Sequence, residues 1–135
     1  MRIQGWELRL AKYLQRALNE PFVWGEHDCA LMAANAIKEI TGVDHAAKYR
    51  GTYSTAEEAA KLMWQDGLEG FAKEAGLEEI ENIKLVNRGD LCLIDNDGHK
   101  AFGVIDMSGY YVVAPGLFGA VMLPKKTILR AWKVD

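Results

Sequence analysis

The chain has 135 residues, half of them hydrophobic, and a formal net charge of −3 at pH 7. This length predicts one domain, residues 1–135, with a core that needs neither disulfides nor metal. The 16 Lys and Arg residues are interspersed with 19 Asp and Glu residues, which argues against the basic surface of a nucleic-acid-binding protein. No run approaches the roughly 18 apolar residues of a membrane span, so we expect no membrane insertion.

Cysteine usage argues against both a disulfide framework and a metal site. Cys29 and Cys92 lie far apart, and the sequence has no CxxC pair and no Cys/His cluster with zinc spacing. We therefore expect no metal and no other cofactor. Two isolated thiols favour a reducing compartment. Because Met1–Gln4 lead into an amphipathic pattern and not into an apolar signal segment, we expect a protein made in the cytoplasm.

The first part of the chain has the periodicity of helices. Apolar residues recur at helical spacing over residues 5–19, and Pro21 ends this first helix. A second apolar stripe begins at Cys29, with Asp28 as its N-cap and Gly42 as its C-terminal stop.

A third and a fourth helix are expected before the pattern changes. The third runs to about residue 65, and the fourth covers residues 68–75 and ends at Gly76. Two pairs of residues fit a capping box for the third helix: Ser54 with Glu57, and Thr55 with Glu58.

After about residue 80 the period approaches two, which indicates strands separated by turns. One such turn is Asp95–Gly98. The sequence therefore predicts an α+β fold in which N-terminal helices pack on a C-terminal antiparallel β-sheet, arranged as a meander. The segments expected to form strands are 91–94, 101–105, 110–114, 117–123 and 128–134.

The segment before the second helix has the features of a cysteine nucleophile. Residues 25–29 read Gly-Glu-His-Asp-Cys, so Cys29 falls in the first helical turn. There it faces unpaired N–H groups and the positive end of the helix dipole, which favour thiolate and lower the pKa of the thiol. A nearby N–H is suited to stabilise an oxyanion. Alternatively, Cys29 is a small apolar residue that begins the buried stripe of its helix.

Several segments resemble a known family. Pro21–Cys29 is similar to the nucleophile segment of NlpC-type papain-fold cysteine peptidases, and Arg88–Ile94 resembles their Gly-Asp strand signature. The variant nearest to this sequence is a family of short phage and prophage proteins with a Pro-Phe-x-Trp-Gly-x-His-Asp-Cys segment. These also share the motifs seen here at Thr41–Asp44, Arg50–Tyr53 and Ala131–Trp132.

The resemblance implies a papain-like (NlpC-type) fold with Cys29 as nucleophile. We expect Trp24, Gly25 and Asp28 to lie at the substrate-binding site. A tight approach at Gly25 lets a substrate backbone come close. The tryptophans are otherwise expected to be core and rim aromatics: Trp6, Trp24, Trp64 and Trp132.

The sequence departs from the family pattern at the general base. Active members carry a histidine in a His-x-Gly-[Ile/Val] setting, and the matching position here is Ala101. Two histidines are candidate substitutes. His99 shares the face of Ala101 if the strand extends that far, although it also fits a solvated turn end. His27 lies two residues before Cys29, where capping or loop hydrogen bonding is the alternative.

Two functions remain open on the sequence. One is an active cysteine peptidase or amidase that cleaves peptide bonds of peptidoglycan, with His99 or His27 as base. The other is a phage or prophage tail protein, at the tail tip or in tail assembly, that keeps the fold without the activity. The alanine at position 101, where active members have a histidine, favours the second function. The expected partners are other tail proteins and peptidoglycan peptides, and the expected locations are the bacterial cytoplasm and the virion tail.

Overall fold

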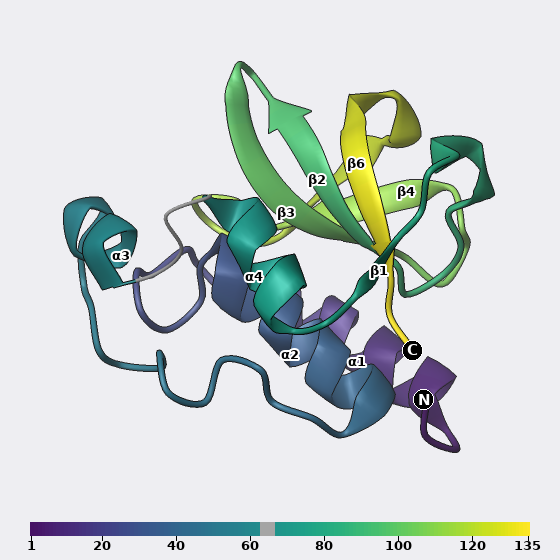
Figure 1. The fold of residues 1–135 in the computed structure, drawn as a ribbon, viewed down its shortest axis with the longest axis horizontal. Helices are drawn as coiled ribbons and strands as arrows, with labels where there is room; N and C mark the ends of the chain where they lie inside the picture. Colours follow the sequence, from purple (N-terminus) through teal and green to yellow (C-terminus); the bar gives the residue numbers. More distant parts are fainter. Residues whose placement is uncertain (63–66) are drawn as a thin grey trace.

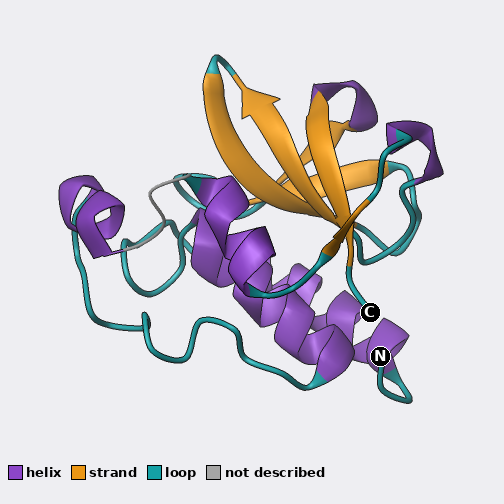
Figure 2. Ribbon diagram, in the orientation of Figure 1, coloured by secondary structure: helices purple, strands orange, loops and turns teal. Residues whose placement is uncertain are grey.

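The computed structural model describes residues 1–62 and 67–135 and has two layers, helices beneath a twisted sheet (Figure 1). The helices are α1 (Trp6–Ala17), α2 (Cys29–Thr41), α3 (Ala56–Leu62) and α4 (Leu68–Glu74). Helices α2 and α4 pack against the sheet, α1 packs on α2, and α3 stands to one side. Figure 2 shows the division between an N-terminal helical part and a C-terminal sheet, which confirms the α+β prediction.

The helix boundaries follow the local sequence signals. Helix α2 begins at Cys29 and ends at Thr41, and its C-cap Gly42 has the left-handed conformation with φ of 81°. At α3 the second capping pair forms, since Thr55 Oγ1 accepts a hydrogen bond from Glu58 N at 3.1 Å. The predicted end of this helix near residue 65, and Trp64, lie outside the described residues.

In the described part of the chain the sheet has six strands in the order β1-β6-β2-β3-β4-β5, all paired antiparallel. The expected meander holds from β2 to β5. The last strand was expected to continue it but instead returns to pair with β2. The strands are β1 (Glu78–Glu79), β2 (Leu91–Asn96), β3 (His99–Ile105), β4 (Tyr111–Ala114), β5 (Val121–Pro124) and β6 (Ile128–Lys133).

The strand predicted over residues 117–123 is shorter than expected, because residues 115–120 form a loop against the end of α1. Ala120 N donates to Ala17 O at 2.8 Å, and Leu117 O accepts from Phe22 N at 3.2 Å. A Cβ on Gly119 would collide with Leu18 O. The N–H of Ala120 and the C=O of Leu117 therefore bond to the end of α1 and to the segment just after it, and they do not pair with a neighbouring strand.

One face of the sheet forms the main core with the helices. Phe102 of β3 lies at its centre, edge-on to Phe71 of α4 at 5.8 Å and to Trp132 of β6 at 6.1 Å between ring centroids. Each fully buried side chain of this kind stabilises the fold by about 1.5–3 kcal/mol. Residues on the other face form a second buried cluster that includes Cys92 and Ala101, and Cys29 packs against both clusters.

The described tryptophans occupy core and rim positions, as expected. Trp132 is buried, whereas Trp6 is half-buried beneath the Arg2 guanidinium, whose Cζ lies 4.1 Å from the ring centroid. Trp24 is partly exposed and stacks edge-on against Phe22.

Candidate functional site

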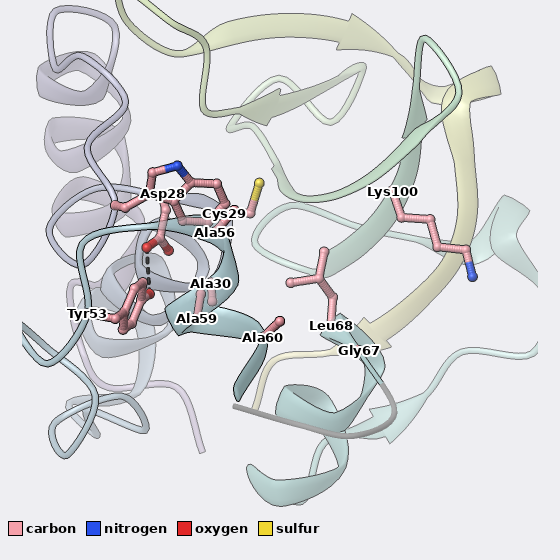
Figure 3. Close-up of a pocket in the computed structure, with 11 residues that line it drawn as sticks. Asp28, Cys29, Ala30, Tyr53, Ala56, Ala59, Ala60, Gly67, Leu68 and Lys100 are labelled. Carbon is pink, nitrogen blue, oxygen red and sulfur yellow. Dashed lines mark hydrogen bonds between the residues drawn. The ribbon is translucent and has the colours of Figure 1, made fainter. Parts of the chain in front are cut away.

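Asp28 and Gly25 shape the loop that leads into Cys29. Asp28 Oδ1 caps α2 by accepting from Leu31 N at 3.0 Å, while Oδ2 accepts from Gly25 N at 3.0 Å and from the Tyr53 hydroxyl at 2.5 Å (Figure 3). Gly25 has φ of 82°, and a Cβ there would collide with Tyr53 O. Both expected binding residues therefore also have a structural role, and the Asp28 carboxylate is buried with both oxygens engaged.

Tyr53 is a site residue that motif chemistry alone did not single out. It belongs to the Arg-Gly-x-Tyr segment, yet only the folded chain brings its hydroxyl to the carboxylate beside Cys29. Burial, and next the hydrogen bond to Asp28, raise the pKa of Tyr53 above its usual value. The hydroxyl is therefore a neutral donor at physiological pH.

The thiol of Cys29 is less acidic than its place at a helix N-terminus predicts. Burial, with a smaller contribution from the Asp28 carboxylate, raises its pKa to about 11. Backbone hydrogen bonds from Phe102 and from Cys29 itself act in the opposite direction but are smaller effects. The expected lowering of the pKa is therefore wrong, because desolvation of the thiolate outweighs the N–H groups.

A cleft of about 460 Å³ opens beside Cys29. Its walls are mainly small apolar side chains from α2, α3 and the start of α4, and Figure 3 shows Lys100 on the side of the cleft across from Cys29. Its size and apolar lining are those of a ligand site. The lining residues are Trp24, Asp28, Cys29, Ala30, Tyr53, Ala56, Ala59, Ala60, Gly67, Leu68 and Lys100.

The position expected for the general base lies near Cys29 but carries only a methyl group. Ala101 belongs to the buried cluster against which Cys29 packs, and its neighbour Phe102 donates a backbone hydrogen bond to the thiol. Among the described residues, no imidazole contributes to the pKa shift of Cys29.

His99 begins β3, so the strand does extend far enough to place it on the face of Ala101. It pairs across the hairpin with Asn96, and its side chain is exposed.

His27 is buried and bonded to other partners. Its Nε2 lies 3.0 Å from the Tyr13 hydroxyl and 3.5 Å from Glu20 Oε2. Within the described chain, Nδ1 has no hydrogen-bond partner. Burial lowers the pKa of His27, while the carboxylates of Glu20 and Asp28 oppose this shift. The His27 ring therefore joins the loop to α1. The sequence predicted only a general role in the loop for His27 and not these hydrogen-bond partners.

Two further features bear on the class of site. Among residues 1–62 and 67–135, no group of three or more His, Cys, Asp or Glu side chains is arranged to hold a metal ion. No helix in these ranges has the length and apolar character needed to cross a membrane.

Comparison with known proteins matches nearly the whole chain to one family model. The family model described as Domain of unknown function (DUF6950) matches residues 1–134. The chain belongs to this family. The match includes both the Cys29 loop and the sheet. No curated protein matches the chain.

Proposed function

We propose that the chain is a phage or prophage tail protein with a papain-like, NlpC-type fold, whose cleft beside Cys29 binds peptides without hydrolysing them. The likeness of Pro21–Cys29 to that family supports the fold assignment. The arrangement supports it too, since a cysteine at a helix N-terminus packs against an antiparallel sheet. The peptides of peptidoglycan are the ligand class that this resemblance suggests.

The observation that carries the non-hydrolytic proposal is Ala101. An acyl transfer by a thiol needs a base to remove its proton and an acid to protonate the leaving amine. The strand position near Cys29 offers a methyl group, and the pKa of Cys29 is raised to about 11, so the thiol is protonated at neutral pH.

One observation favours the alternative, an active cysteine peptidase or amidase. The Cys29 thiol lies on an open cleft, and a backbone hydrogen bond from Phe102 favours its thiolate form. In an active peptidase, His99 or His27 supplies the base after the segment that carries it moves towards Cys29.

Turnover and binding of peptidoglycan stem peptides separate the two functions. We expect the wild type to bind the peptides in calorimetry and to release no product, and Cys29→Ala to bind equally well. Ala60→Phe, which fills the cleft from an exposed position, should weaken binding at least tenfold. Ala47→Phe, exposed outside the cleft, is its matched control. Turnover that is lost in Cys29→Ala and in His99→Ala or His27→Ala would establish the peptidase instead.

Ala101→His tests why hydrolysis is absent. It returns an imidazole to the strand position near Cys29, and we expect faster alkylation of Cys29 at neutral pH because a neighbouring imidazolium stabilises the thiolate. An unchanged alkylation rate in a folded variant would show that the missing base is not what keeps the thiol inactive.

A further inference from the structure

The loop formed by residues 21–28 is tied to the helices through a buried cluster of polar side chains. His27 Nε2 lies 3.0 Å from the Tyr13 hydroxyl of α1, and Asn35 of α2 donates to the same hydroxyl at 3.1 Å. Glu20, just after α1, approaches Nε2 at 3.5 Å. One imidazole therefore connects both helices to the loop.

The cluster suits a neutral imidazole only. When Tyr13 donates its hydroxyl proton to Nε2, the neutral ring carries its own proton on Nδ1, which faces no acceptor in the described part of the chain. A second proton goes on Nε2, where it displaces the hydrogen bond that Tyr13 donates and places a positive charge on a ring that is 4 % exposed. Both the buried charge and the lost hydrogen bond oppose protonation in this arrangement.

The charged groups around His27 compensate such a charge only in part. Glu20 is the carboxylate in contact with the ring, and it is half-exposed to water. Asp28 acts on the ring at longer range, but hydrogen bonds already engage both of its oxygens. Two cations, Arg16 and Arg50, act on the partner Tyr13 and add positive potential to the cluster.

The same loop forms part of the cleft wall. Val23 and His27 exchange two backbone hydrogen bonds, of 3.0 and 2.8 Å, which close the loop around Trp24 and Gly25. Trp24 lines the cleft. We propose that His27 is an acid-sensitive latch, whose protonation releases residues 21–28 from α1 and so opens the cleft wall beside Cys29.

The direction of the effect follows from linkage. Burial lowers the pKa of His27 below 6.5 in the closed loop, whereas an exposed imidazole in the open loop keeps an ordinary value. Above that pH both states are neutral and the latch holds. As the pH falls below 6.5 the open state binds the proton better, and its population rises by up to about thirtyfold at pH 5.

Amide hydrogen exchange followed by NMR tests the latch. We expect the protection of the Val23 and His27 amides, corrected for intrinsic exchange, to fall towards this thirtyfold limit between pH 7.5 and 5. The Ile105 amide, bonded to Asp90 O in the sheet, should stay unchanged. His27→Gln should abolish the pH dependence, and His45→Gln, at a histidine outside the cluster, should retain it. Glu20→Gln should enlarge the fall, because the charged ring loses its nearest carboxylate.

Three outcomes would overturn the latch. The first is protection of Val23 and His27 that does not change with pH. The second is an equal loss at Ile105, which would mean that acid unfolds the whole chain. The third is an unchanged pH dependence in His27→Gln. If His27→Gln does not fold, the wild type decides alone, because its imidazole resonance must titrate below pH 6.5 and in step with the Val23 amide.

Discussion

At the scale of single residues, the two cysteines differ in access more than in acidity. Burial raises the pKa of Cys29 to about 11 and that of Cys92 to about 12. Cys92 is fully buried in the sheet, whereas Cys29 is partly exposed at the cleft. The helix N-terminus therefore places Cys29 in an accessible position but does not make it a thiolate at neutral pH.

We predict that iodoacetamide labels Cys29 faster than Cys92 at pH 8. Because only the thiolate reacts, the Cys29 rate should keep rising with pH above neutrality and reach half of its plateau near pH 11, where half of the thiol is ionised. Peptide mass spectrometry of quenched samples measures both rates. Equal rates, or a Cys29 rate that levels off near pH 7, would contradict the burial argument.

At the scale of elements, the loop before α2 depends on close backbone contacts. Gly25 O accepts from Gly51 N at 2.9 Å, and Asp28 holds Gly25 N at 3.0 Å. Thus the loop at residues 21–28 and the segment at residues 50–53 support each other. The capping signal of Asp28 was readable in sequence, whereas its second role at Tyr53 spans 25 positions and was not.

We predict that Gly25→Ala lowers the free energy of unfolding by about 2–4 kcal/mol, since an alanine there would adopt a strained φ and contact Tyr53 O. Gly98→Ala is the matched control, because Gly98 has φ of 85° but a Cβ there would meet no other atom within 4 Å. It should cost only about 1–2 kcal/mol. Urea unfolding measures the free energy of unfolding of both variants. Equal losses of stability would show that the contact with Tyr53 O is not the cause.

At the scale of the whole molecule, the helical layer and the sheet share one aromatic centre. Phe102 lies between Phe71 and Trp132, so α4, β3 and β6 meet at this side chain. Phe102 is also the residue whose backbone N–H faces Cys29. The packing of the core therefore determines where the thiol lies relative to the sheet.

We predict that Phe102→Ala destabilises the fold by about 3–5 kcal/mol through lost burial and an internal cavity. Phe118→Ala, at a side chain that is 86 % exposed, should change stability by less than about 0.5 kcal/mol. Thermal unfolding of the two variants checks the difference. A small effect at Phe102 would mean that the two layers do not depend on this contact.

The sequence alone determined the features that depend on neighbours in the chain. Periodicity and capping residues placed α2 at Cys29, and the change of period located the sheet, because helix and strand patterns repeat over a few residues. Only the tertiary structure shows that β6 pairs with β2 and that residues 115–120 pack against the end of α1. It also decided the chemistry, because the pKa of Cys29 and the partners of His27 depend on burial and on groups from distant segments.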